Sequence, residues 1–132
     1  MLDHLHSGLS GFLRRKNFVP KQERVDGAIP LSIDNRYRIY CRPAAHGDLV
    51  LEARLIDLPM QASDVDALIR ECLLASWVRM HEHADVPVLS ENETSIFLEQ
   101  RISADASIDE FEAALEKFTN SIADWRRIFR IL

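Results

Sequence analysis

The residues that could bind a metal ion gather at His81-Glu82-His83. Two histidines of one helix share an ion when they are three or four residues apart, because that spacing places both rings on one face. Residues two apart on a helix point in directions about 200° apart, so the rings of His81 and His83 diverge. The pattern favours an exposed helix end over a metal site, and we expect the protein to use no metal or other cofactor.

The two cysteines, Cys41 and Cys72, are the candidate redox groups or nucleophiles. Their separation is not the CxxC spacing of redox and zinc sites, and no base close to either can be named from the sequence. We expect two free thiols that pack in the core, a state that suits a reducing cytosol.

Carboxylates are plentiful, but their arrangement does not indicate catalysis. Several of them line the solvent side of the C-terminal segment, a pattern typical of a solvated helix face: Asp109, Glu110, Glu112 and Glu116. The GxGxxG, P-loop and GxSxG motifs do not occur in the sequence. Because no set of converging polar side chains can be named, an enzyme is the least favoured class of function.

A local basic stretch follows the N-terminal segment: Arg14, Arg15, Lys16, Lys21 and Arg24. Such a stretch could contact nucleic acid or an acidic partner. The whole chain has 16 Lys and Arg against 21 Asp and Glu, a net charge of −5, which disfavours a dedicated nucleic-acid binder. A small nucleic-acid-binding module stays an alternative, and a steep salt dependence of binding would support it.

The length and composition predict one domain that spans residues 1–132. A chain of 132 residues with 47% hydrophobic residues buries enough surface to fold without disulfides or a metal. No uncharged run approaches the about 20 residues of a membrane span, so we expect no membrane insertion. The N-terminus shows no basic region followed by a long apolar run, so no secretory signal is expected.

Hydrophobic periodicity predicts a helix at each end and one in the middle, with short strands between them. The expected elements are a helix through about residue 16, strands at 29–33, 36–42 and 49–55, a helix from Ser63 or Asp64 to about His83, strands at 86–90 and 95–102, and a helix from Ser107 onward. The order α-β-β-β-α-β-β-α indicates an α+β fold, a twisted antiparallel sheet with helices packed on it.

Several local features refine this prediction. Ile33-Asp34-Asn35-Arg36 is expected to form a turn between the first two strands. Pro30 cannot donate to a strand ladder, so the first strand is expected at an edge of the sheet. Gly8 and Gly11 inside the first helix indicate that something approaches it closely. Ser107 and Glu110 have the spacing of a capping box at the start of the last helix. Trp77 and Trp125 lie on apolar stripes, where a core position is favoured over an interface.

Surplus apolar surface on short elements indicates self-association or a partner. In this arrangement the chain resembles the class I type III secretion chaperones of Gram-negative bacteria, the Tir-chaperone (CesT-like) family. The resemblance follows residues 25–34, 47–53, Leu58-Pro59 and the central helix, and is strongest over 98–102, 108–118 and 123–126. The central helix reads Leu73-Leu74-Ala75-Ser76-Trp77 where the family often has Leu-Leu-x-Ala-Asn.

The resemblance implies a homodimeric protein of the bacterial cytoplasm without enzymatic activity. Such a chaperone binds the N-terminal segment of one or more secreted effectors in extended form, and the secretion ATPase is a further partner that the resemblance suggests. A regulator that shares the fold but handles no secreted cargo remains an alternative.

The same analogy supplies two sets of site residues. The effector-binding set is Leu5, Leu9, Phe12 and Leu13 of the first helix with Ile29, Leu31 and Ile33 of the first strand. The dimer-interface set is Leu68, Cys72, Leu73, Trp77 and Met80 of the central helix.

Overall fold

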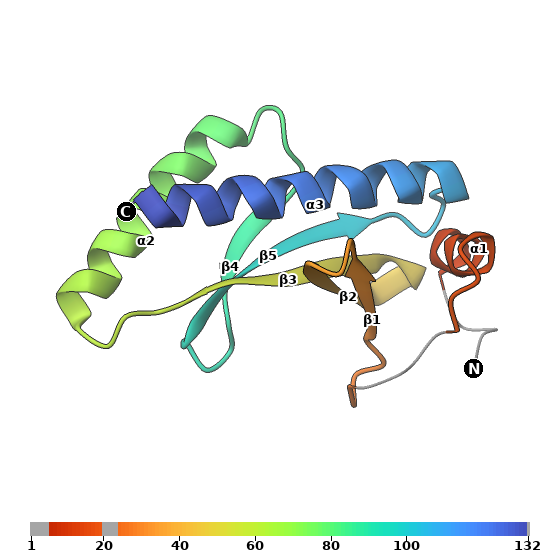
Figure 1. Cartoon of the computed structure of the whole chain (residues 1–132), viewed down its shortest axis with the longest axis horizontal. Helices are drawn as coiled ribbons and strands as arrows, with labels where there is room; N and C mark the ends of the chain where they lie inside the picture. The colour runs from red at the N-terminus through yellow and green to blue at the C-terminus, as the bar shows by residue number, and fades with distance from the viewer. Residues whose placement is uncertain (1–5, 20–23, 132) are drawn as a thin grey trace.

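The computed structural model describes residues 6–19 and 24–131, which form an α+β fold in the predicted order. The elements are α1 (Ser7–Arg15), β1 (Ile29–Ile33), β2 (Tyr37–Pro43), the 3-10 turn η2 (Ala45–Gly47), β3 (Leu49–Asp57), α2 (Ala62–Arg79), β4 (Val86–Leu89), β5 (Ser95–Ile102) and α3 (Ile108–Ile131). Figure 1 shows α3 lying along the sheet, with α1 beside its first turns and α2 crossing near its C-terminal end.

The five strands form one sheet in the order β1-β2-β3-β5-β4, and every neighbouring pair is antiparallel. β1 is an edge strand, as Pro30 predicted. The predicted turn before β2 is also confirmed, because the backbone N–H of Arg36 donates to the carbonyl of Ile33 at 3.0 Å. Asp34 and Asn35 have φ angles of 55° and 54°, a region that these two residue types tolerate.

The core lies between the sheet and α3. Alternate strand residues such as Ile39, Leu51 and Leu98 point to this side and are fully buried. From α3, a stripe at spacings of three and four residues covers them, and each member is buried: Phe111, Leu115, Phe118, Ile122, Trp125 and Phe129. The predicted capping box is present. The backbone N–H of Ser107 donates to Glu110 Oε1 at 2.9 Å, and that of Glu110 donates to Ser107 Oγ at 3.1 Å.

The other face of the sheet carries a network of charged side chains. Glu52 is buried at the centre of this network and forms ion pairs with Arg24 at 2.7 Å and with Arg42 at 3.3 Å. Arg42 also reaches Glu99 on β5 at 3.4 Å. A buried carboxylate is stable only with such partners, so the network neutralises the middle of this face.

The close approach predicted at the two glycines of α1 is confirmed, and the element that approaches is α3. A Cβ atom on Gly11 would lie 2.3 Å from Cδ1 of Ile108, and one on Gly8 would lie 3.1 Å from Cβ of Phe111. His6 caps the helix: its Nδ1 accepts from the backbone N–H groups of Gly8 and Leu9 at 3.1 and 3.3 Å. The α1–α3 contact therefore belongs to the core of the chain.

The bounds predicted for α2 are wrong at both ends. The helix begins at Ala62 behind Gln61, and no side chain caps it, although Ser63 or Asp64 was expected to do so. It ends at Arg79, and the next residues form a turn in which the N–H of His83 bonds to the carbonyl of Arg79 at 3.1 Å. The histidine pair thus lies beyond the helix. Of the helices in the described ranges, none has the length and apolar character to cross a membrane.

Candidate interaction surface on α2 and β4

α2 differs from the other helices in how much apolar side chain it leaves uncovered. Leu73 is 66% exposed and Trp77 72% exposed. Large apolar residues that are exposed on this helix and on the neighbouring edge strand are Leu73, Leu74, Trp77, Val78, Met80, Val86 and Leu89. We call this set the α2–β4 surface. Uncovered apolar patches of this size are typical of interaction sites.

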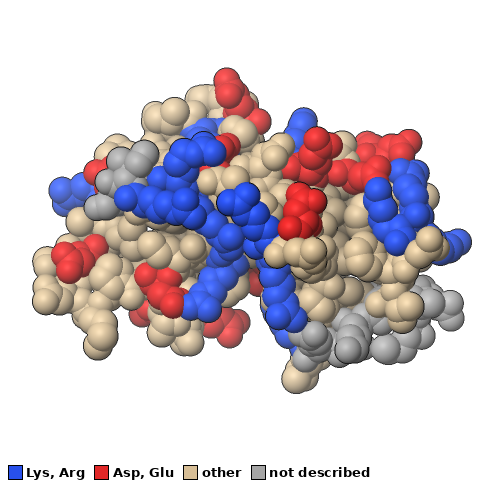
Figure 2. Space-filling model, viewed as in Figure 1, with Lys and Arg blue, Asp and Glu red and all other residues tan. Residues whose placement is uncertain are grey.

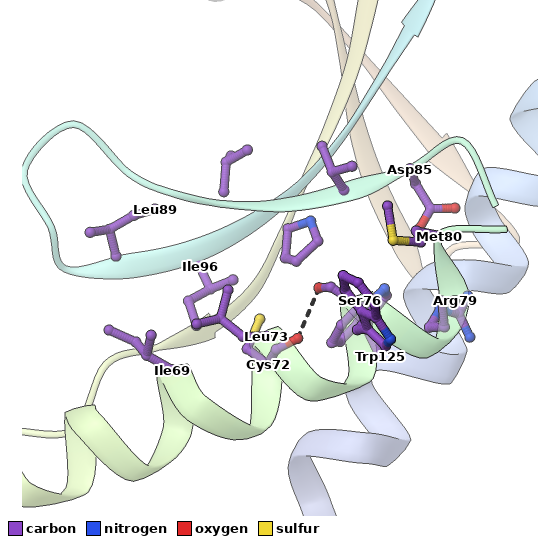
Figure 3. Close-up of a pocket in the computed structure, with 14 residues that line it drawn as sticks. Ile69, Cys72, Leu73, Ser76, Arg79, Met80, Asp85, Leu89, Ile96 and Trp125 are labelled. Carbon is purple, nitrogen blue, oxygen red and sulfur yellow. Dashed lines mark hydrogen bonds between the residues drawn. The ribbon is translucent and has the colours of Figure 1, made fainter.

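A pocket of about 480 Å³ lies between α2 and the β4–β5 hairpin. Figure 3 shows Ile69 and Leu73 of α2 facing Leu89 and Ile96 across it. Trp125 of α3 closes the inner side. The walls are mainly apolar, so the pocket can take an apolar side chain from a partner and remove it from water.

One end of this pocket is polar. Arg79 donates to Ser121 Oγ at 3.1 Å and to Asp124 Oδ2 at 3.4 Å, and its guanidinium lies 5.6 Å from the centre of the Trp125 ring. These contacts fasten the C-terminal end of α2 to α3. Within the described part of the chain, Arg79 Nε, Asp85 Oδ1 and Trp125 Nε1 are buried without a hydrogen bond.

The thiol at the pocket is not an activated nucleophile. Cys72 is buried, and burial raises the pKa of its thiol above the ordinary value. Burial raises the pKa of Cys41 in the same direction. A raised pKa reduces the thiolate that metal binding and attack require. Both cysteines are free and buried, as the sequence predicted.

The structure divides the predicted dimer-interface set into two groups. Leu73, Trp77 and Met80 lie on the α2–β4 surface, where a second chain could contact them. Leu68 and Cys72 are buried and attach α2 to its own core. The preference for a core position is right for Trp125 and wrong for Trp77 within the single chain. Sequence reasoning missed Leu74, Val78, Val86 and Leu89, although apolar residues all around a helix are a signal that it is covered on more than one side.

The predicted effector-binding set lies mostly inside the fold. Five of its side chains are buried between α1, the sheet and α3: Leu9, Phe12, Leu13, Ile29 and Leu31. The space beside the two glycines of α1 holds no groove for a peptide, because α3 packs there. Ile33 is half-buried at the end of β1, and Leu5 lies outside the described residues.

A hollow of about 570 Å³ borders this region between α1, β1 and α3. Ile33 and Phe12 line it together with Phe18, which follows α1 and is exposed. Effector contact at this region stays a prediction, and its accessible part is the hollow with Ile33 and Phe18 at its rim.

The fold and these surfaces define a small α+β protein with uncovered apolar side chains on α2 and β4. The sequence model of the Tir chaperone protein (CesT) family matches residues 8–126, and the chain belongs to this family. The resemblance seen in the sequence is thereby confirmed, and the protein is a chaperone by family. No curated protein sequence matches it in a direct comparison.

Solved structures of type III secretion chaperones share the fold. The Yersinia pestis chaperone SycH, in complex with a stable fragment of YscM2, is 15% identical with a TM-score of 0.63 over 91% of this chain and 98% of the other. A chain of the HopA1–SchA chaperone–effector complex is 19% identical with a TM-score of 0.68, covering 95% and 92%. A chain of the ExsC–ExsE complex is 21% identical with a TM-score of 0.67, covering 96% and 90%.

Proposed function

We propose that this protein is a non-enzymatic type III secretion chaperone of the bacterial cytoplasm. As a homodimer it binds the N-terminal segment of a secreted effector in extended form and keeps that segment competent for export. The observation that carries the proposal is the exposed α2–β4 surface on a chain of the Tir chaperone family. The similar structures support it, since one is a chaperone–effector complex and another is a type III secretion chaperone with a bound fragment of YscM2.

The α2–β4 surface is the proposed dimer interface. A two-fold contact is self-complementary, so Trp77 of one copy can enter the pocket of the other while its own pocket receives the partner's Trp77. Burial of an exposed tryptophan and its apolar neighbours stabilises the contact by roughly 25 cal/mol per Å² before the cost of association.

The effector segment is proposed to bind at the hollow between α1, β1 and α3 and along the edge of β1. An edge strand presents unpaired backbone groups, and an extended peptide can pair with them while its alternate side chains enter neighbouring pockets. Ile33 and Phe18 provide apolar contact at this place. Pro30 lacks one donor, so pairing with β1 is interrupted at that residue.

The experiment has two parts, the first being the mass in solution. Light scattering at micromolar concentration should give about 30 kDa, twice the chain mass of 15.2 kDa. Trp77→Asp should shift the mass toward one chain, because a charge in an apolar interface is desolvated without a partner. Val19→Asp is the matched control, since Val19 is exposed and follows α1, which lies at the other end of the molecule from α2. A single chain at all concentrations, or equal effects of both variants, would contradict the dimer proposal.

The second part is capture of cargo. A tagged N-terminal segment of a candidate effector should co-purify with the native chain, and Phe18→Glu combined with Ile33→Glu should remove it. The dimer mass and the circular dichroism of this double variant should stay native, because both side chains lie at the rim of the core. Undiminished binding by the double variant would place the cargo elsewhere.

A further inference from the structure

Four arginines from two distant parts of the chain line one small hollow. Arg36 comes from the turn between β1 and β2, and Arg126, Arg127 and Arg130 come from the last turns of α3. The hollow has a volume of about 180 Å³ and is completed by Tyr37 and Ala123. We call it the arginine hollow. Figure 2 shows Lys and Arg side chains gathered in a band that runs from the C-terminal end of α3 toward the strands.

Aromatic and backbone contacts orient two of these guanidinium groups. The ring of Tyr37 has the guanidinium of Arg36 at 5.6 Å and that of Arg126 at 5.4 Å from its centre. Arg126 also donates from Nη2 to the backbone carbonyl of Arg54 at 3.2 Å. Stacking on an aromatic ring fixes the plane of a guanidinium and leaves its edge free to form paired hydrogen bonds. The side chains of Arg36 and Arg126 are therefore already partly ordered, so binding of a partner loses less conformational entropy.

The positive charge of the hollow is poorly balanced within the chain. Asp124 is the carboxylate that contacts it: it accepts from Arg127 at 3.3 Å and from Arg79 at 3.4 Å. Across the described residues, Arg36, Arg126 and Arg130 form no ion pair. Cations at the end of α3 complement the helix dipole, which accounts for the residues of α3. The helix dipole does not account for Arg36, because this residue comes from the turn between β1 and β2.

We infer that the arginine hollow binds carboxylates of an acidic peptide segment of a partner protein. Guanidinium groups with fixed planes match the two oxygens of a carboxylate, and several of them around one hollow can hold two neighbouring acidic residues. The hollow lies apart from the lining of the α2–β4 pocket and of the hollow at Phe18, so the inference does not rest on either proposed role.

The charges around the hollow favour a short acidic peptide over a nucleic acid. The chain has a net charge of −5, and Figure 2 shows acidic side chains on the same face toward the other end of α3. A nucleic acid that extends beyond the hollow reaches this acidic surface and is repelled. A peptide can have its acidic residues confined to the length of the hollow, so it avoids this repulsion.

The test uses a fluorescein-labelled peptide of alternating Glu and Ser, with the Gln-for-Glu peptide as its uncharged match. Anisotropy should show binding of the Glu peptide to the native protein, weakened at least about tenfold when salt rises from about 50 to about 300 mM. The Gln peptide should bind at least about tenfold more weakly than the Glu peptide, because it lacks the charge of the carboxylates.

Arg36→Gln combined with Arg130→Gln should weaken binding of the Glu peptide about tenfold or more, since each lost contact to a charged group has a large effect. Arg14→Gln combined with Lys117→Gln removes the same charge from exposed positions outside the hollow. This control should change the affinity by less than about threefold, through the long-range field alone. Equal losses in the two double variants would overturn the inference.

Further measurements keep the inference testable on the unmutated protein. In NMR titrations the Glu peptide should shift the ring signals of Tyr37 and leave those of Tyr40 unchanged. Shifts elsewhere but not at Tyr37 would overturn the proposed site. A single-stranded oligonucleotide of matched charge should bind more weakly than the peptide. Tighter binding of the oligonucleotide would overturn the inference of an acidic peptide and indicate a nucleic acid as the partner. Failure of cargo capture with intact peptide binding would leave this inference standing and reject the proposed function instead.

Discussion

α2 and α3 are the two long helices of the molecule, and they use their apolar residues in opposite ways. In α3 these residues recur every three or four positions on one stripe, which lies against the sheet and is buried. In α2 they are spread around the helix, so that Leu68 and Cys72 are buried while Leu73, Leu74 and Trp77 remain exposed. Their first turns differ as well: a capping box starts α3, and no side chain caps α2.

The two tryptophans express this difference most clearly. Trp125 of α3 is 1% exposed and Trp77 of α2 is 72% exposed, although each follows an apolar helical pattern. α3 has the sheet beneath it, whereas α2 lies beside the edge strand β4 and has little of its own chain to cover it. The comparison shows that one helix completes the core of the chain, while the other leaves large apolar side chains uncovered.

The largest expected effect is on the α3 side. Phe118→Ala should lower the free energy of unfolding by about 3–5 kcal/mol, because it leaves a cavity at a fully buried position. Leu74→Ala on α2 is the comparison and should change the stability of the single chain by less than about 0.5 kcal/mol, since Leu74 is exposed. Urea unfolding at low protein concentration measures both. A loss below about 1 kcal/mol for Phe118→Ala would break the contrast.

The next effect is on the α2 side and concerns association. Trp77→Ala should raise the dissociation constant of the dimer about 30-fold or more, the effect of a central interface tryptophan worth about 2 kcal/mol. Sedimentation at a series of concentrations measures it. Trp125→Phe, at the inner wall of the pocket, should affect unfolding more than association. The reverse ranking would show that α2 is not the interface.

A third prediction tests how tightly α3 is held by its neighbour. Gly11→Ala should destabilise the chain by about 1–3 kcal/mol, because its new methyl group meets the Ile108 side chain at 2.3 Å. The same substitution in an Ile108→Ala background should cost less, since the colliding atoms are gone. A double-mutant cycle followed by thermal unfolding measures this coupling. Purely additive effects would mean that α1 shifts away from α3 without loss.

The smallest expected effect is the pH dependence at the start of α3. Hydrogen bonds from Ser107 hold the pKa of Glu110 below its ordinary value. A carboxyl group whose pKa is lower in the folded than in the unfolded chain stabilises the fold above the unfolded pKa, and this stabilisation is lost as the pH falls through the folded value.

Unfolding midpoints of the native chain and of Glu110→Gln should therefore differ at pH 7 and converge at a pH below the folded pKa of Glu110. Asp48 and Asp57, whose pKa values are lowered by Arg101 and Arg54, are unchanged in both proteins. A difference that stays constant with pH would assign the effect of Glu110→Gln to something other than its charge.

Much of the fold follows from patterns that act over a few residues. The order of the elements, the edge position of β1 from Pro30, the turn at Asp34 and Asn35 and the capping box at Ser107 were all predicted from the sequence. The start of α2 was predicted wrongly because Ser63 and Asp64 are good capping residues, and tertiary context moved the helix start to Ala62.

The candidate surfaces were predicted less well for a physical reason. An apolar residue at helical spacing is equally suited to a core and to an interface, and only the position of the other elements decides between them. The glycines of α1 showed that something lies close, but only the packed structure shows that it is α3 and not a cargo peptide.

The sequence by itself determined the local conformations, because caps, turns and periodicity depend on residues close along the chain. The tertiary structure decided which side chains remain available to partners. It left Trp77 exposed beside β4, buried Leu9 and Phe12 under α3, and brought Arg36 to Arg126 across a long stretch of chain. Those outcomes depend on how the strands pair and where each helix lies on the sheet, and no short stretch of sequence contains that information.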